Sequence, residues 1–593
     1  MPEVAAESFL GVDQSVCGKR WTLRAGDERA ALQMAQQLGI PEIVARVLAG
    51  RGVDIAAAPQ FLEPRLRDQL PDPSHLKDMD KAAARLAAAI RAGEPIAVFG
   101  DYDVDGATSS ALLNRFVSQV GGRVRVYIPD RIKEGYGPNA EALLRLQSEG
   151  AGVVVTVDCG TTAHQPLARV AAAGLDVIVI DHHAAEPKLP EAFAIVNPNR
   201  LDEQSPHRQL AAVGVAFLLA VATNRALRQA GWYADRAEPD LLDLLDLVAL
   251  GTVCDVVPLT GLNRVLVVQG LKVVAQRRKA GLIALADIAQ LEQRCGAYHL
   301  GFVFGPRVNA GGRVGAADLG TRLLTTDDPH EARAIAVDLD RLNRERQAIE
   351  AAVLEAAHAH VAAKAAGSMV LVAGQGWHPG VIGIVASRLR EHYERPACVI
   401  ALDGDIGKGS GRSANGFDLG AAIITARQAG LLINGGGHSQ AAGFTVARER
   451  LPELESFLNE RVSAHIASGR FVPRMSVDGA LALRSVSPDL VELLERVGPY
   501  GSGNPEPRFV FPNVTVARAD IVGEKHVRCF LSDQQGGRLG AIAFRSVGTR
   551  LGDALLARGG AAIHLVGTLR VDRWRGEARI QFCIEDAAPA QPA

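Results

Sequence analysis

Strand-like and helix-like segments alternate from about residue 76 to residue 183 of this 593-residue chain. Short apolar runs such as PIAVFG, VVVTVD and DVIVI indicate buried strands, and the segments between them, such as SALLNRFVSQVG, have the apolar spacing of helices. Strands that alternate with helices in this way predict a mostly parallel sheet with helices on both faces. We therefore expect an α/β domain over residues 76–327.

The rest of the chain divides into four further segments. Residues 1–75 are helix-rich, and residues 328–366 contain no Gly or Pro after Pro329, which predicts one helix about 55 Å long. A coiled coil is the alternative for that helix, but its heptads do not continue, so we expect a connection between two lobes. An α/β pattern resumes over residues 367–465, and the β-rich runs of residues 466–593 predict a small barrel.

The composition of the chain excludes some classes of function and location. The formal net charge is -2, so any surface that binds nucleic acid must be local. Seven scattered cysteines without a CxxC pair argue against a disulfide framework and for a reducing compartment. The N-terminus lacks the pattern of a signal peptide, and aspartates interrupt the longest apolar run, so we expect a cytoplasmic protein without a membrane span.

Acidic and imidazole side chains follow four apolar runs, each of which is interpreted as a strand, including the run LLDLVALGTVC before Asp255. In DYDVDG, three aspartates stand at alternate positions and would project to one side if the preceding strand continues through them. Carboxylates with imidazoles suit Mn²⁺ or Mg²⁺, and open α/β sheets place their sites at the carboxyl ends of strands. Caps and turns are the alternative for each segment alone, but four such segments together favour a metal site. The candidate residues are Asp101, Asp103, Asp105, Asp158, Asp181, His182, His183 and Asp255.

The segments DYDVDG, VTVDCGTT, DHH and GTVCDVVP resemble, in order and spacing, the four motifs of the DHH phosphoesterases. The resemblance implies a two-metal site that hydrolyses phosphoric esters or anhydrides. It implies two divalent cations, Mn²⁺ or Mg²⁺, clamping the attacking and leaving oxygens. The implied metal ligands are Asp103 and Asp105 on different cations, Asp158 between them, His182 and Asp255 on the second, and Asp101 directly or through water. His183 would face the substrate phosphate, Asp181 would orient the histidines, and these two with Asp103 are the candidate catalytic residues.

Further segments resemble the RecJ exonucleases, over most of residues 40–590: DRIKEGYGPN, FGPRVNAGGRVGAADLG and GPYGSGNPEPRFVF. This resemblance implies a parallel-sheet DHH domain, a long connecting helix, a smaller α/β DHH-associated domain and a C-terminal OB-fold β-barrel. The implied activity is 5′-to-3′ hydrolysis of single-stranded DNA to 5′-mononucleotides in recombination and repair. Single-strand-binding protein and a helicase are the implied partners, and we expect a monomer.

Substrate contacts are expected at three places. Arg307, Asn309 and Arg313 stand in a Gly-rich segment, interpreted as a loop, that offers arginines to phosphate, although Arg307 bracing that loop is the alternative. The resemblance implies that Ser410 and Arg412, with Arg131 opposite, bind a 5′-terminal phosphate. It also implies that Tyr136 lies in a backbone-contacting segment and that His438 contacts phosphate, unless it is a packed structural histidine.

In the barrel, cationic and aromatic side chains are candidates for binding a single strand, with at most one ring expected to stack on a base. They are Lys525, Arg528, Arg545, Arg570, Arg573, Phe530, Phe544 and Trp574.

Two other functions compete with the exonuclease hypothesis. An oligoribonuclease or nucleotide phosphatase of the same superfamily would act on short substrates, which do not need the extra barrel. A scaffold that has lost catalysis would lack some acidic ligands, whereas this chain has all of them.

Overall fold

The computed structural model describes residues 7–130, 134–135, 137–291, 294–364, 367–467, 473–557, 561–572 and 579–590. It divides into two units, one of residues 66–471 and one that combines residues 1–65 with residues 472–593. Among the described residues, no helix has the length and apolarity that crossing a membrane requires. All seven cysteines are free thiols.

The first part of the larger unit is a five-stranded parallel sheet in the order β3-β2-β4-β5-β6. This confirms the predicted parallel sheet. The strands are β2 (Ile96–Gly100), β3 (Val124–Tyr127), β4 (Val153–Val157), β5 (Asp176–Ile180) and β6 (Ala194–Val196). The helices between and after them are α5 (Met79–Ala92), α6 (Val104–Gln119), α7 (Ala140–Ser148), α8 (His164–Ala172) and α9 (Ala212–Gln229).

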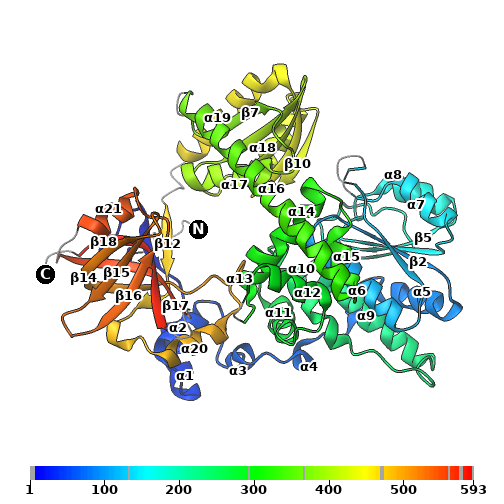
Figure 1. Cartoon of the computed structure of the whole chain (residues 1–593), viewed down its shortest axis with the longest axis horizontal. Helices are drawn as coiled ribbons and strands as arrows, with labels where there is room; N and C mark the ends of the chain where they lie inside the picture. The colour runs from blue at the N-terminus through cyan, green and yellow to red at the C-terminus, as the bar shows by residue number, and fades with distance from the viewer. Residues whose placement is uncertain are drawn as a thin grey trace. The chain divides into compact units, whose positions relative to one another are not determined.

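Alternate residues of β2 pack into two different cores. Ile96 and Val98 belong to a core with α5, α6 and α9, whereas Ala97 and Phe99 belong to a core with α7 and α8. Figure 1 shows these two groups of helices on opposite faces of the sheet. Phe99 is fully buried, and burying such a side chain contributes about 1.5–3 kcal/mol. Both faces of the strands are therefore apolar, and their polar residues follow the strand ends.

A helical layer extends this part of the unit. It comprises α4 (Leu66–Gln69), α10 (Leu245–Cys254), α11 (Gly261–Val274), α12 (Ala280–Ile288), α13 (Ala297–His299), the π-helical turn η4 (Leu300–Phe304), α14 (Gly305–Val314) and α15 (Leu319–Thr325). The predicted connecting helix is α16 (Pro329–Ala362), with 34 residues and a length of about 51 Å. Asp328 caps it by accepting a hydrogen bond from the backbone N–H of His330.

The second part of the larger unit is a mixed five-stranded sheet in the order β10-β11-β9-β8-β7. Only β7 and β8 pair in parallel. The strands are β7 (Val370–Gln375), β8 (Ala397–Asp403), β9 (Ile406–Arg412), β10 (Asn434–His438) and β11 (Ala441–Ala447), and the helices are α17 (Ile382–Tyr393), α18 (Leu419–Gln428) and α19 (Leu451–Ala467).

The smaller unit contains the predicted barrel, which is closed by five strands. They are β14 (Phe509–Val522), β15 (His526–Ser532), β16 (Arg538–Ala543), β17 (Ala562–Asp572) and β18 (Arg579–Pro589), with α21 (Arg550–Ala557) between β16 and β17. The other α-helices and β-strands of this unit are β1 (Arg20–Leu23), α1 (Glu28–Leu38), α2 (Glu42–Ala49), α3 (Ala58–Leu62), β12 (Arg474–Val477), β13 (Gly479–Ala480) and α20 (Pro488–Val497).

Segments from the two ends of the chain pack together in this unit. Strand β1 pairs in parallel with β12. The buried carboxylate of Asp586 on β18 accepts hydrogen bonds from the Ser15 hydroxyl at 2.6 Å and from Trp21 Nε1 at 3.1 Å. Because these partners are more than 560 positions apart, no local sequence pattern indicates this association.

Candidate active site

The aspartates of DYDVDG lie in a turn from strand to helix. Strand β2 ends at Gly100, and Asp103 is the N-cap of α6, where its carboxylate accepts a hydrogen bond from the N–H of Gly106 at 3.0 Å. Asp105 is in the first turn of that helix. The expectation that the strand continues through all three aspartates is therefore wrong. The turn still brings Asp101 and Asp103 together, and with Asp158 they form one of the groups that could hold a metal ion.

The other donors follow two strands and one helix. Asp158 follows β4 with a left-handed backbone (φ 62°), and Asp181, His182 and His183 follow β5. Asp255 is the C-cap of helix α10, so the expectation that it ends a strand is also wrong. The apolar run before it is buried on all sides as a helix, and a continuous apolar run has no periodicity that distinguishes a helix from a strand.

Three overlapping groups of donors could each hold a metal ion: Asp101 with Asp103 and Asp158, Asp158 with His182 and His183, and Asp105 with His182 and Asp255. Within each group, one donor atom per residue lies within 4.8 Å of the others. The Nε2 atom of His182 is 3.3 Å from Asp158 Oδ1, 3.5 Å from Asp255 Oδ2 and 3.9 Å from Asp105 Oδ2. Asp158 and His182 are thus each shared by two of the groups.

The donor atoms fit a divalent cation. The Nε2 atom of His182 and the Oδ2 atom of Asp255 are buried and form no hydrogen bond with any described residue. A buried polar atom without such a partner is costly unless something else binds it. Carboxylate oxygens and imidazole nitrogen are ligands for Mn²⁺ and suit Mg²⁺ where oxygen dominates.

The electrostatics of the cluster also favour a cation. Burial, together with the charge of Asp103, raises the pKa of Asp105 to about 7. Burial and the neighbouring aspartates raise the pKa of Asp255 to about 9 and that of Asp158 well above its ordinary value. Burial and the adjacent His183 lower the pKa of His182 to about 4, which leaves a neutral imidazole able to bind metal.

Asp181 holds both histidines from behind. Its Oδ1 atom accepts hydrogen bonds from the backbone N–H groups of His182 and His183 at 2.7 and 3.1 Å and from His183 Nδ1 at 2.8 Å. Its Oδ2 atom accepts from the N–H of Thr161 at 3.0 Å. Burial alone would raise the pKa of Asp181, but these hydrogen bonds and the charge of His183 lower it below its usual range. In return, Asp181 raises the pKa of His183 despite the effect of burial.

Two asparagines extend this support, and the sequence reasoning missed both. Asn197 donates to the carbonyl of His183 at 2.9 Å, and Asn199 donates to the carbonyl of His182. They follow β6 in the segment NPN. A polar residue directly after a buried strand is the signal that identified the aspartates, and it could have identified these residues too.

Two glycines allow the helices to approach the donors. A Cβ atom on Gly106 would lie 2.6 Å from the backbone nitrogen of Asp101, and one on Gly251 of α10 would lie 2.8 Å from Val213 Cγ1 and 3.1 Å from Asp105 Oδ1. Any larger residue at either position would displace a candidate metal ligand.

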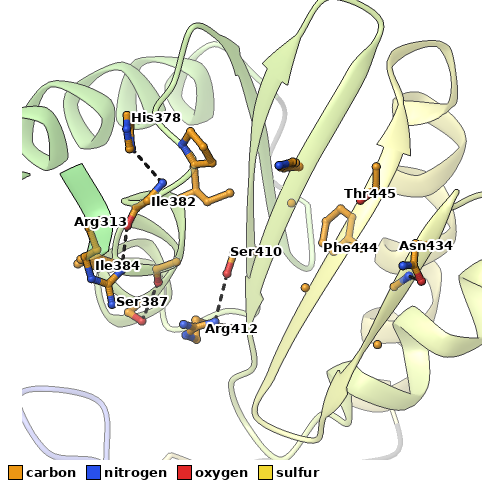
Figure 2. Close-up of a pocket in the computed structure, with 18 residues that line it drawn as sticks. Arg313, His378, Ile382, Ile384, Ser387, Ser410, Arg412, Asn434, Phe444 and Thr445 are labelled. Carbon is orange, nitrogen blue, oxygen red and sulfur yellow. Dashed lines mark hydrogen bonds between the residues drawn. The ribbon is translucent and has the colours of Figure 1, made fainter. Parts of the chain in front are cut away.

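A cavity of about 640 Å³ lies in the second part of the same unit (Figure 2). It is lined by Ser410, Arg412, Lys408 and the first turn of α17, together with Arg313 from α14. Figure 2 shows Ser410 and Arg412 on the side of β9 that faces α17, where Arg412 Nη1 is 3.3 Å from the Ser410 hydroxyl. Cations, a hydroxyl and a helix N-terminus together favour an anion. Burial lowers the pKa of Arg412, and no described carboxylate offsets this effect.

The remaining substrate candidates have different surroundings. Arg307, Asn309 and Arg313 are on helix α14, so the expected Gly-rich loop is wrong. Arg307 donates to Asp340 Oδ1 at 3.0 Å and to the carbonyl of Val303, which are bracing contacts, and Asn309 is half-buried outside the cavity. His438 is exposed on β10 and does not line the cavity.

Other candidates lie on the barrel or outside the described residues. Six candidates are exposed on the barrel: Lys525, Arg528, Arg545, Arg570, Phe530 and Phe544. Arg570 forms an ion pair with Glu506, in which the closest nitrogen and oxygen atoms are 2.6 Å apart. Arg131, Tyr136, Arg573 and Trp574 lie outside the described residues.

Family models match three parts of the chain: the DHH family N-terminal domain over residues 95–252, the DHHA1 domain over residues 363–464 and the RecJ OB domain over residues 477–586. The single-stranded-DNA-specific exonuclease RecJ of Salmonella typhimurium (strain LT2) is 36% identical over 580 residues, or 95% of this chain and 98% of that protein.

Two solved structures of RecJ from Thermus thermophilus are also similar. The complex with Mn²⁺ has a TM-score of 0.79 at 31% identity and covers 96% of this chain and 79% of that chain. The complex with Mg²⁺ has a TM-score of 0.74 at 30% identity and covers 96% and 78%.

The parallel sheet, the DHHA1 domain and the clustered donors thus define a DHH-family protein with a divalent-metal centre. The relatives and donor clusters confirm the expected Mn²⁺ or Mg²⁺ cofactor. The chain belongs to the RecJ family and is a nuclease.

Proposed function

We propose that this chain hydrolyses single-stranded DNA from the 5′ end and releases 5′-mononucleotides at a two-cation centre. The observation that supports the proposal is that the donor groups and a cavity lined by Lys408, Arg412 and Arg313 lie in the same unit. Helix α14 connects the two: a Cβ on Gly312 would lie 2.6 Å from the carbonyl oxygen of Tyr102, and the next residue, Arg313, lines the cavity. A cavity that binds one terminal phosphate beside a metal centre makes cleavage start at an end.

In this proposal, Asp103 and Asp105 would each hold a different cation, Asp158 would be shared by both cations, and His182 and Asp255 would be further ligands of the second cation. Asp101 binds directly or through water. Such a pair of cations stabilises the attacking and leaving oxygens of an in-line displacement and makes a bound water more acidic. The protein's own contribution is to hold the carboxylates close together in a buried site, where burial and mutual repulsion raise the pKa values of Asp105 and Asp255 and bound cations would keep them ionised.

His183 is positioned to contact the substrate phosphate. Its side chain is 49% exposed, and the hydrogen bond between its Nδ1 atom and Asp181 fixes the orientation of the ring. Because Asp181 raises the pKa of His183, the ring holds a proton and its positive charge up to a higher pH than an ordinary histidine. Asp181 acts as a positioning residue through both histidines.

The 5′-terminal phosphate would bind Ser410 and Arg412 at the N-terminus of α17. Arg412 is half-buried, and a Cβ on Gly383 of that helix would lie 3.1 Å from the Ser410 hydroxyl. A terminal phosphate would form charge-assisted hydrogen bonds with the Arg412 guanidinium, whose pKa burial lowers. The proposal keeps Arg131 as a further contact to this phosphate, as the family resemblance implies, although this residue lies outside the described residues.

The barrel favours a polymer as substrate. A short oligonucleotide or a nucleotide does not need the additional domain that matches the RecJ OB model, and OB folds bind single strands through cationic and aromatic surfaces. The named activity of the relatives agrees with this substrate. We further propose a monomeric cytoplasmic enzyme of recombination and repair that works with single-strand-binding protein and a helicase.

The test uses single-stranded DNA labelled at the 5′ or the 3′ end, with Mn²⁺, and compares the wild type with Asp103→Ala and with Asp176→Asn, a partly exposed carboxylate at the other end of β5. We expect the 5′ label to be released first as a mononucleotide by the wild type and Asp176→Asn, with no release by Asp103→Ala. Release of the 3′ label first, or turnover only of oligomers shorter than about five nucleotides, would refute the proposed function.

A further inference from the structure

Two aromatic rings stand exposed on the larger unit. Tyr298 and Phe302 have exposed fractions of 62% and 71%, and their rings stack with centroids 5.1 Å apart and planes 28° from parallel. Every other Phe, Tyr or Trp that the structure describes in this unit is buried or half-buried. In a chain with few aromatic residues, an exposed stacked pair is an unusual use of them.

The pair lies beside the metal centre. Phe302 belongs to the π-helical turn η4, and this turn packs against the end of α10. The Sγ atom of Cys254 is 3.4 Å from the carbonyl oxygen of Leu300, and a Cβ on Gly301 would lie 3.3 Å from Val253 Cγ1. The residue that follows Cys254 is Asp255, one of the metal-binding candidates.

The local backbone is held in uncommon conformations. Val256, directly after Asp255, has a φ of 61° and is 69% exposed. A β-branched residue rarely adopts this conformation, and π-helical turns are also rare and occur often at functional sites. The strained residue and the π-helical turn flank the end of α10. Next to the candidate ligand Asp255, the exposed side chains of Val256 and Phe302 therefore form an apolar surface.

We propose, on the basis of the function proposed above, that Tyr298 and Phe302 form a stacking platform for the bases of the single strand. In such a complex the phosphates of the strand lie near the cations, and the unpaired bases expose flat apolar faces that can stack on the rings. Every base has such a face, so the platform binds any sequence. In a duplex the bases are stacked on each other and their faces are covered, so the platform favours single strands.

The experiment measures KM and kcat on single-stranded oligonucleotides in which one abasic nucleotide is moved along the sequence. Stacking of one base changes affinity by about 5- to 150-fold. For the wild type, we expect the abasic nucleotide to raise KM by a factor in this range at one or two fixed distances from the 5′ end. For Tyr298→Ala with Phe302→Ala, we expect KM to be raised on the intact oligonucleotide, with no further effect of the abasic nucleotide and kcat unchanged.

Two variants provide the controls. Val337→Ala removes an apolar side chain of α16 that is 54% exposed, and it should behave as the wild type. Tyr298→Phe with Phe302→Tyr keeps both rings and should keep the abasic effect. The proposal is overturned if the double alanine variant still responds to the abasic nucleotide as the wild type does, which would also be the result if another protein surface covers the rings. A wild type that does not degrade single-stranded DNA would instead refute the proposed function.

Discussion

Replacing Asp181 with asparagine should break the support of both histidines. The carboxylate accepts four hydrogen bonds, three at Oδ1 from His182 and His183 and one at Oδ2 from Thr161. An asparagine at this position has one acceptor oxygen in place of two. Its NH₂ group takes the place of the other oxygen, so at least one backbone N–H loses its acceptor. The side chain is almost fully buried, so water does not replace the lost partner.

The cost can be added from these contacts. One buried N–H without an acceptor costs about 1–3 kcal/mol, and three remaining hydrogen bonds each weaken by about 1 kcal/mol when the acceptor loses its charge. We therefore expect Asp181→Asn to lower the free energy of unfolding by about 4–6 kcal/mol. Asp176→Asn is the matched control on the same strand, because its partly exposed ion pair with Arg85 is worth less than about 1 kcal/mol.

The assay is urea unfolding in the presence of Mn²⁺, followed by the pH dependence of nuclease activity. Because Asp181 raises the pKa of His183, its loss should lower that pKa and move the alkaline limb of the activity profile to lower pH. An unfolding free energy within about 1 kcal/mol of the wild type, together with an unchanged pH profile, would refute the role given to Asp181.

Three further predictions concern the metal centre and the cavity. Gly251→Ala should lower stability by about 1–3 kcal/mol and weaken Mn²⁺ binding measured by calorimetry, because its methyl group collides with Thr108; unchanged Mn²⁺ affinity would contradict this. The stabilisation by Mn²⁺ over EDTA, measured as a difference in Tm, should widen as pH rises from about 4 to about 9. Burial raises the pKa of Asp255 to about 9, so the metal-free protein loses the stability that the protonated carboxyl contributes as pH rises through that value. A difference in Tm that does not change with pH would contradict this. Arg412→Ala should raise KM for 5′-phosphorylated single strands by about 10- to 150-fold, while Arg388→Ala, which removes a half-exposed cation of the same domain, should not; equal effects of the two variants would contradict the phosphate site.

The sequence identified the donors of the metal centre better than it identified their backbone. Alternate spacing selected Asp101, Asp103 and Asp105, yet the strand ends at Gly100 and the helix begins with Asp103 as its cap. A carboxylate at an N-cap and one at a strand end look alike in a single sequence. Whether the carboxylates lie at an N-cap or on a continued strand depends on the close approach of α6 to the end of β2, and this approach requires Gly106.

Long-range packing accounts for most of what the sequence could not predict. The run before Asp255 is apolar at every position but Asp246 and Thr252, and the helices around it, not its own pattern, determine that it is a helix. The same holds for the association of Trp21 with Asp586, which depends on packing between the two ends of the chain. Strand and helix positions within residues 76–183 were predictable because local periodicity determines them.

The proposal that two cations bind around Asp158 is tested most directly by counting the Mn²⁺ ions that the protein binds. Equilibrium dialysis with radioactive Mn²⁺ measures this number for the wild type and for Asp158→Ala, with Asp176→Asn as the control. Because Asp158 is shared by two of the donor groups, we expect two ions per wild-type chain and per control chain, and fewer than two for Asp158→Ala. One ion in the wild type, or two retained by Asp158→Ala, would contradict a centre of two cations bridged by this carboxylate.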